Sequence, residues 1–286
     1  MKKNNPIKGS LTIVSLPIGN LKDITLRAIE TLESSDIIYC EDTRTTIKLT
    51  NHYNIKTPLK SYHEHSTSKV REKITTELND GKNISLVSDA GTPLISDPGY
   101  KLIRDLQDKG LKISSAPGVS SPIMALTLSG IPTDKFLFIG FLPIKNSARR
   151  DYLLEIQYIS ASIIIFESAK RINKTLAELN EIFGNRRTSV CRELTKKFEE
   201  IISGNIESVI ADLSNRESLK GEIVIVLEGF SDTYKKDIDI ESMLLDALPI
   251  MSASEASKEV SKFTNLSRKE VYNIALKLKG KIKNDT

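Results

Sequence analysis

The first 140 residues alternate short runs of β-branched and other apolar residues with longer segments of helical periodicity, and turn residues separate the two. Alternation of this kind is typical of α/β folds, in which crossover helices join parallel strands. The short connections favour a mostly parallel sheet with helices on both faces. We expect strands at 11–16, 37–40, 84–87 and 111–114, and helices at 24–32, 69–78, 100–107 and 121–128.

A second α/β lobe is expected after residue 143. The apolar strand 136–141 ends in Leu142-Pro143, and the polar, basic stretch 145–150 follows it. We therefore divide this part of the chain into an amino-terminal lobe over 1–143 and a second lobe over 144–230. The second lobe should contain strands at 162–166, 188–191 and 223–227, with helices at 170–182 and 206–213.

The last part of the chain, 231–286, has a different character. A polar, turn-rich linker at 229–239 precedes three short helical patterns, at 241–248, 253–263 and 268–278. Ser267 and Glu270 have the spacing of a capping box, which predicts where the last helix begins. The last two helices fit a helix-turn-helix pair and fit a small helical cap equally well. Residues 256–286 hold eight Lys/Arg against three Asp/Glu, which suits phosphate contact or a solvated helix face.

Composition narrows the class of protein. A chain of 286 residues with 39% apolar content can bury two sizeable cores. Its two cysteines, Cys40 and Cys191, are far apart and form no CxxC, which argues against a disulfide framework or zinc cluster and favours the reducing cytoplasm. No run approaches the roughly eighteen apolar residues of a membrane helix, and the start lacks a secretory pattern, so we expect no membrane association.

Three glycine-bearing turns follow expected strands, where open parallel sheets bind their ligands. They are SLPIGN at 15–20, SDAGTPLISDPG at 88–99 and APGVSS at 116–121. None has the spacing of a dinucleotide fingerprint or a P-loop, which excludes both. The turns offer bare backbone groups, small side chains and the carboxylate of Asp89. Such a lining suits a flat ligand with a polar edge and a positive centre, although each turn alone is also ordinary loop chemistry.

Polar clusters follow strands in both expected lobes, at 41–44, 167–171 and 192–197. A shared cleft would bring them together, and solvated loop tips would explain each one equally well; Asp42 would also serve as a helix N-cap. We expect no metal, because the three histidines, His52, His63 and His65, lack a cysteine or acidic partner at ligand spacing. Hydrolase chemistry is not indicated either, since no nucleophile elbow is present.

The motifs together resemble a known family, the ribosomal RNA small subunit methyltransferases I, which belong to the tetrapyrrole methylases. The resemblance rests on PIGNLKDIT at 17–25, EDTR at 41–44, VSDAGTPLISDPGY at 87–100, GIPTD at 130–134, GFLP at 140–143, RELTK at 192–196 and KGE at 220–222. The motifs match the family in order and approximate spacing over nearly the whole chain.

The resemblance implies a two-lobed α/β fold of the tetrapyrrole methylase type with a small helical segment at the end. It implies S-adenosylmethionine between the lobes, a homodimer, and 2′-O-methylation of the ribose of cytidine 1402 in 16S rRNA of the small ribosomal subunit. The family's cofactor contacts fall on the same three turns, which here means Pro17, Gly19, Asp89, Ala90, Gly91, Thr92, Ser120 and Ser121.

A ribose hydroxyl is a poor nucleophile, so such an enzyme needs a general base. We prefer Glu167 and Glu193 for this role over Glu41 and Asp42, and Lys196 would serve if burial kept it neutral. In the family a proline and a histidine commonly occur shortly after the glutamate, where this chain has Ala169-Lys170; if that histidine acts as a base, the assignment fails here. Guanidinium forks match phosphate oxygens, and the expected RNA contacts are Arg44, Arg171 and Arg192.

Two alternatives stay open. One is another tetrapyrrole-methylase-type enzyme that methylates a tetrapyrrole ring or a diphthamide precursor, although the EDTR and RELTK stretches match the RNA enzymes better. The other is a non-catalytic RNA-binding or ribosome assembly factor that keeps the fold, which binding of the cofactor would exclude.

Overall fold

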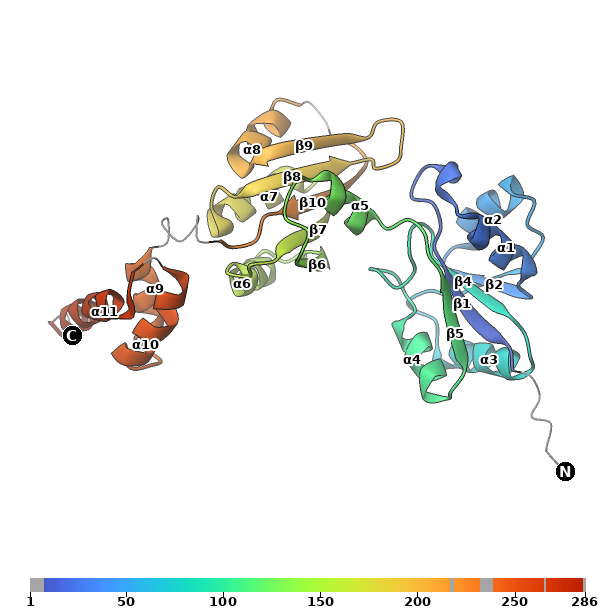
Figure 1. Ribbon diagram of the computed structural model, residues 1–286, viewed down its shortest axis with the longest axis horizontal. Coiled ribbons are helices and arrows are strands. Elements are labelled where there is room, and N and C mark those ends of the chain that lie inside the picture. The colour runs from blue at the N-terminus through green and yellow to red at the C-terminus, as the bar shows by residue number, and fades with distance from the viewer. Residues whose placement is uncertain (1–7, 217–218, 232–238, 265, 285–286) are drawn as a thin grey trace.

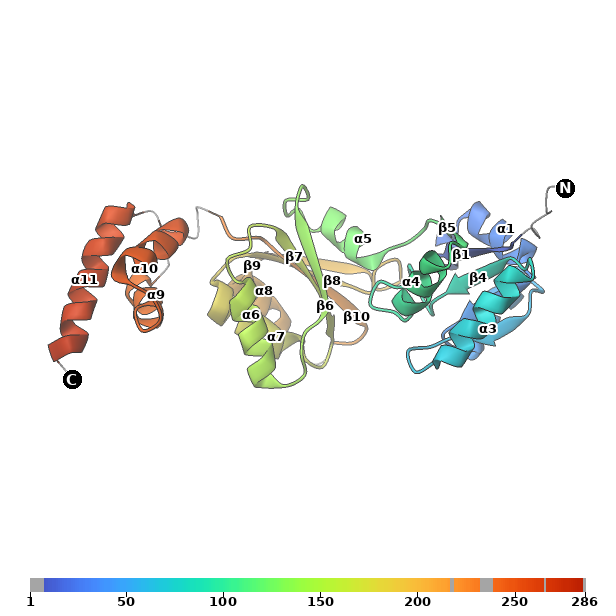
Figure 2. The same ribbon diagram turned by 90° about the horizontal axis from the view of Figure 1, so that it is seen from below.

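The computed structural model describes residues 8–216, 219–231, 239–264 and 266–284, with the backbone alone described for 280–284. Two α/β lobes and a helical unit follow one another along an elongated molecule (Figures 1 and 2). No helix within the described ranges combines the length and the apolar character needed to cross a membrane.

The first lobe contains a five-stranded sheet in the order β3-β2-β4-β1-β5, and all of its strand pairs are parallel. Its strands are β1 (Ser10–Val14), β2 (Ile37–Cys40), β3 (Leu59–Ser61), β4 (Ile84–Val87) and β5 (Lys112–Ala116). The chain leaves β1 toward β2 and leaves β4 toward β5, so the strand order reverses between β1 and β4. Ligands of open parallel sheets bind in the crevice at such a reversal.

Helices cover both faces of this sheet, as the sequence predicted. On one face, α3 (Ser68–Asn79) and α4 (Tyr100–Asp108) bury Ile74, Leu78, Leu102 and Leu106 against the strands. On the other, α1 (Leu26–Ser34) and α2 (Thr43–His52) bury Ala28, Leu32 and Leu49. Asp42 caps α2 by accepting a hydrogen bond from the Arg44 amide, so this cluster begins a helix.

The second lobe contains a mixed sheet in the order β6-β7-β10-β8-β9, in which only β6 and β7 are parallel. Its strands are β6 (Phe136–Phe141), β7 (Ser162–Ser168), β8 (Arg187–Arg192), β9 (Glu200–Asn205) and β10 (Glu222–Leu227). One face packs on α6 (Asn146–Ile156), α7 (Ile172–Phe183) and α8 (Ile206–Ser214). The other face packs on α5 (Ser121–Leu128) through Ala125 and Leu126, and on Ile18 from the first lobe.

The chain therefore passes from the first lobe to the second before residue 143, where the boundary was expected. Strand β6 pairs with β7, and α5 contacts the second sheet, so both elements lie with the second lobe. The stretch 145–150, expected to be a boundary, begins α6 instead. Its buried Arg149 pairs with Glu178 of α7, a contact that a local reading of polar residues does not reveal.

The helical unit consists of α9 (Ile240–Ala247), α10 (Ala253–Val260), a short 3-10 turn (Ser261–Phe263) and α11 (Arg268–Asn284) around its own small core. The predicted capping box is confirmed: the Ser267 amide donates to Glu270 Oε2 at 2.7 Å, and the Glu270 amide donates to Ser267 Oγ at 3.3 Å. Tyr158 of the second lobe contacts this unit, with its ring 4.5 Å from that of Phe263. Most of the expected linker, 232–238, lies outside the described residues.

Candidate active site

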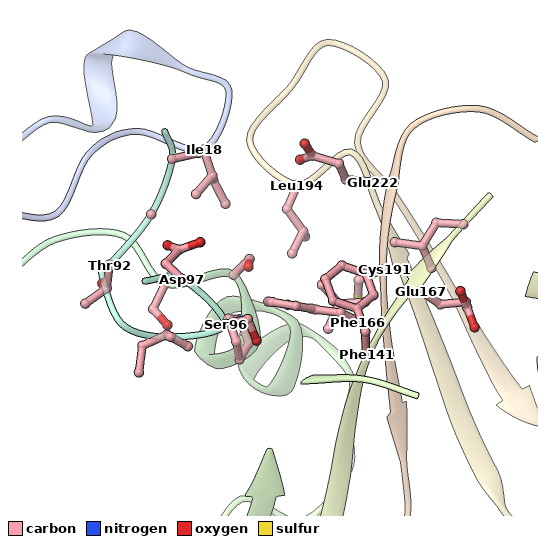
Figure 3. A pocket seen from close by; sticks show the side chains of 18 of the residues that line it. Ile18, Thr92, Ser96, Asp97, Phe141, Phe166, Glu167, Cys191, Leu194 and Glu222 are labelled. Carbon is pink, nitrogen blue, oxygen red and sulfur yellow. The ribbon is translucent and has the colours of Figure 1, made fainter. Parts of the chain in front are cut away.

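A cavity of about 360 Å³ lies where the first lobe meets the second sheet (Figure 3). The first lobe and the start of α5 contribute three sets of lining residues, Ile18, the loop residues 90–92 and 95–97, and 120–122. The second lobe contributes Phe141, Phe166–Ser168, Cys191, Leu194 and 221–224. This volume falls in the range of small-molecule pockets.

The three turns selected from the sequence are joined to one another at the cavity. Leu16 and Gly91 exchange two backbone hydrogen bonds of 2.8 and 2.9 Å, which ties the turn after β1 to the loop after β4. The hydroxyls of Ser15 and Thr92 lie 3.0 Å apart, and Thr92 donates to the carbonyl of Val119 at 2.9 Å. The reversal between β1 and β4 brings these turns together, because the carboxyl ends of parallel strands share one edge of a sheet.

Five of the eight expected cofactor residues line the cavity: Ala90, Gly91, Thr92, Ser120 and Ser121. The other three lie beside it. Pro17 is buried in the first turn, Gly19 faces an adjacent cleft, and Asp89 accepts a hydrogen bond from the Asp42 amide at 3.1 Å.

Two loops that face each other across the cavity hold strained backbone. Positive φ occurs at Leu94 (74°) and Ser96 (66°) in the loop after β4, and at Glu193 (51°) and Thr195 (65°) in the loop between β8 and β9. Side chains other than glycine adopt this region at a cost of about 1–3 kcal/mol each, and such residues cluster at functional sites. Asn54 is the one other non-glycine residue with positive φ in the described part of the chain.

Asp97 directs its carboxylate into the cavity (Figure 3). Burial, together with the charge of Asp89, raises the pKa of this carboxyl group above its usual range, against the effect of a hydrogen bond from Ser88. Burial also raises the pKa of Glu41, to which the carboxylates of Asp97 and Asp89 add. The amino-terminal side of the site therefore gathers negative charge, which favours a cationic ligand.

Glu167, a preferred base in the sequence analysis, directs its carboxylate away from the cavity (Figure 3). Alternation along β7 places Phe166 toward the cavity and Glu167 toward α7. The Glu167 carboxylate accepts hydrogen bonds from Thr175 Oγ1 at 2.6 Å, Arg171 Nε at 2.8 Å and the Ser168 amide at 2.6 Å. Its side chain is 1% exposed, so the choice of Glu167 as the base is corrected: the group holds β7 to α7.

This assignment predicts a large effect on stability. Glu167→Ala should lower the free energy of unfolding by about 3 kcal/mol, because it leaves polar groups of Arg171 and Thr175 without their buried partner. Chemical denaturation measures this. Glu181→Ala is the matched control: Glu181 lies on α7, its pair with Arg150 of α6 is exposed, and its loss should cost less than about 1 kcal/mol. Equal effects of the two substitutions would contradict a structural role for Glu167.

Glu193 and Lys196, the other two expected catalytic residues, pair with each other at 2.8 Å. Lys196 also pairs with Glu222 of β10 at 3.0 Å. Burial alone would lower the pKa of Lys196, but these two hydrogen bonds outweigh it and raise the pKa, so the amine stays protonated. The hydrogen bond from Lys196 lowers the pKa of Glu193. The condition under which Lys196 would serve as a base, a neutral amine, is therefore not met, and the lowered pKa makes Glu193 a weak base.

The three arginines expected at RNA phosphates all have acidic partners. Arg171 pairs with Glu167 at 2.7 Å, and Arg192 with Glu200 at 3.2 Å. Arg44 pairs with Asp42 at 2.6 Å but is 87% exposed, so among the three it is the most accessible to an added anion.

Sequence reasoning missed three residues of the site: Asp97 and the two phenylalanines that form a wall of the cavity, Phe141 and Phe166. Asp97 lies within the longest family motif, and its position just before Pro98-Gly99 and α4 was the available signal. Phe166 and Phe141, with ring centroids 5.4 Å apart, come from the ends of expected strands, where nothing local distinguishes a cavity wall from core. Within the described ranges, no group of three or more His, Cys, Asp or Glu side chains could hold a metal ion.

Comparison with known proteins assigns the family. A family model described as tetrapyrrole (corrin/porphyrin) methylases matches residues 10–210, and one described as the RsmI C-terminal HTH domain matches 235–279. The chain belongs to the tetrapyrrole methylase family. Within it, the chain is 47% identical to ribosomal RNA small subunit methyltransferase I of Rickettsia prowazekii, over 96% of this chain and 98% of that protein. It is 40% identical to the Bacillus subtilis protein of the same name, over 93% of each chain.

Solved structures agree on the fold. Diphthine synthase matches with a TM-score of 0.58 at 14% identity, covering 77% of this chain and 90% of that one. Uroporphyrin-III-C-methyltransferase from Thermus thermophilus matches with a TM-score of 0.52 at 16% identity, covering 80% and 96%. The second family model identifies the helical unit as a helix-turn-helix domain, which resolves the choice left open by its sequence.

Proposed function

We propose that this chain is an S-adenosylmethionine-dependent methyltransferase of small-subunit ribosomal RNA, and that its target is the ribose 2′-hydroxyl of cytidine 1402 in 16S rRNA. The observation that carries the proposal is a cavity formed by three linked turns, with the Asp97 carboxylate pointing into it. Relatives named for this rRNA activity, similar over nearly their whole length, support the substrate.

The residues present fit the cofactor. Gly91 has φ 73°, and a Cβ there would lie 3.4 Å from Ile18, so a side chain would crowd the cavity. The absence of that side chain lets a flat ligand approach the backbone at Ala90 and Gly91 closely. The related Thermus methyltransferase was crystallised with S-adenyl homocysteine, which supports the same kind of ligand here. The bound cofactor would supply an electrophilic methyl group on a positively charged sulfur.

Ala90, Gly91, Thr92, Ser120 and Ser121 would hold this cofactor directly. Pro17 and Gly19 would shape the first turn, and Asp89 would add negative charge at the end of β4. The carboxylates of Glu41, Asp89 and Asp97 favour a positive centre, because opposite charges attract strongly in a partly buried site.

Asp97 is our candidate for the general base. It is the one carboxylate that lines the cavity and has no ion-pair partner among the described residues, since Glu167 pairs with Arg171 and Glu222 with Lys196. A raised pKa makes a carboxylate a better proton acceptor at neutral pH. Asp97 would accept the proton of the target hydroxyl and release it to solvent after transfer.

Phe141 and Phe166 form the opposite wall (Figure 3). Phe141 is 59% exposed, so its ring is accessible to a ligand in the cavity. Unpaired bases of RNA stack on such rings, at about 1–3 kcal/mol per base, so this wall would hold the target base and exclude water.

Ribose-methylation mapping of 16S rRNA tests the function. Cells that lack this protein should lose one 2′-O-methyl group, at cytidine 1402, and the wild-type gene should restore it. An unchanged methylation map in the deletion strain would overturn the proposed target. Binding of S-adenosylmethionine, measured by calorimetry, distinguishes an enzyme from an RNA-binding factor that has kept only the fold.

We also propose that the protein is a homodimer in the cytoplasm. Exposed apolar side chains on α5 and around β6 would suit a second subunit, because exposed large apolar residues often mark interfaces. They are Ile123, Leu128, Phe136 and Ile144.

A further inference from the structure

A second, open cleft of about 730 Å³ borders the cavity. One wall is the turn after β1 with the end of α2, and the other is the loop between β8 and β9. Its lining includes Lys22, His52, Lys196 and Lys197, and no aspartate or glutamate among the residues that the structure describes. The cleft therefore presents positive charge to solvent, unlike the acidic side of the cavity.

The cleft and the cavity are neighbours, because two chain segments run from one to the other. Ile18 lines the cavity and the next residue, Gly19, lines the cleft. On the opposite wall, Leu194 lines the cavity and Thr195 lines the cleft. A strand that enters the cavity with one nucleotide can therefore place neighbouring nucleotides at this cleft.

Lys196 forms the partition between the two. Its aliphatic stem lies against Gly19, where a Cβ would be 2.3 Å from Lys196 Cγ. Its ammonium group bonds Glu193 and Glu222, so its charge is already compensated. Lys196 thus separates the cavity from the cleft and has little charge left for an external anion.

Lys22 and Lys197 differ from Lys196 in this respect. Both are exposed, and neither has an acidic partner within the described ranges; the Lys197 ammonium lies 5.6 Å from the centre of the Phe198 ring. They stand on opposite walls of the cleft, so a phosphodiester strand between them can contact both. In contrast, Arg171 and Arg192, which the sequence suggested for this role, are held by Glu167 and Glu200.

We infer that this cleft binds the phosphate backbone of the RNA strand next to the target nucleotide, through Lys22 and Lys197. The inference rests on the proposed function, because it takes the cavity as the place where the target nucleotide is methylated. Two lysines on opposite lobes then make the phosphate contacts that the sequence suggested for Arg171 and Arg192.

The test uses the full-length protein with small ribosomal subunits isolated from the deletion strain. Lys22→Gln and Lys197→Gln, singly and together, are compared with Lys73→Gln, which removes an exposed charge from α3 on the far side of the first lobe. Three quantities are measured: the KM for subunits, kcat at saturating subunits, and the slope of log affinity against log salt. Calorimetry with S-adenosylmethionine checks the cofactor site.

The double variant should raise the KM for subunits about tenfold and leave kcat and cofactor affinity unchanged. Each single variant should reduce the salt slope by roughly 0.7, the value for one phosphate contact on a single strand. Lys73→Gln should change none of these. A double variant with the wild-type KM and salt slope, in a preparation whose wild type methylates subunits, would overturn the inference.

Failure of the proposed function gives a different result. Suppose the wild type binds subunits with a salt slope that depends on Lys22 and Lys197 but transfers no methyl group. That result would support RNA binding at the cleft and contradict the proposed methyltransferase activity. If the wild type neither binds nor methylates subunits, both are overturned.

Discussion

Asp97→Asn should reduce the rate of methyl transfer to small subunits by about 10²–10⁴-fold, the usual contribution of a general base. The amide keeps the size of the side chain and cannot accept the proton. Affinity for S-adenosylmethionine should fall much less than the rate. Single-turnover kinetics at saturating cofactor and subunits isolates the chemical step from binding.

The pH dependence gives an independent check. Only the carboxylate form of Asp97 can accept a proton, and burial beside Asp89 raises its pKa. The wild-type rate should therefore rise with pH through this raised pKa and then level off, whereas the variant should lack that rise. Asp108→Asn, an exposed change at the end of α4, is the control and should behave as wild type. A variant at Asp97 that keeps both rate and pH profile would remove this residue from the reaction.

Gly91→Val should weaken binding of S-adenosylmethionine by at least about 100-fold. A β-branched side chain at φ 73° is strained, at about 1–3 kcal/mol, and its Cβ would contact Ile18 at 3.4 Å, with the two methyl groups beyond it. The backbone groups of Gly91 also bond Leu16, so a shift here would disturb the junction of two turns. Calorimetry measures the affinity, and circular dichroism checks that the fold survives.

Gly110→Val is the control that distinguishes the effect of backbone strain from the effect of a side chain in the cavity. Gly110 has φ 64°, close to that of Gly91, but a Cβ there would meet nothing within 4 Å. It should therefore lose stability through the same backbone strain and bind the cofactor normally. If Gly91→Val binds as tightly as Gly110→Val, the loop after β4 does not contact the cofactor.

The turns could be found from sequence because their position follows from topology. Any parallel sheet brings the carboxyl ends of its strands to one edge, and glycine, proline and serine at those ends mark where backbone is exposed. Gly91 and Thr92 were therefore accessible to local reasoning. The crossover helices of the first lobe were accessible too, because their apolar periodicity is strong and their neighbours are close in sequence.

The roles of acidic residues could not be found in the same way. Strand alternation predicts that Phe166 and Glu167 point to opposite faces of the sheet. Which of the two faces the cavity depends on what packs against each face, and the sequence does not show that. The protonation of Lys196 depends on Glu222, which lies 26 residues further along the chain. Strand β9 was missed for a similar reason: its sequence EIISGN carries a weak pattern, and pairing with β8 defines it.

The acidic groups around the cavity have a consequence for turnover. Glu41, Asp89 and Asp97 attract a ligand that carries a positive sulfur, and this attraction is strengthened by partial burial. A thioether, the form left when the methyl group has gone, is neutral at sulfur and gains nothing from them. The same three carboxylates that draw in the fresh donor would therefore attract the spent one less strongly, and this difference favours the exchange of one for the other.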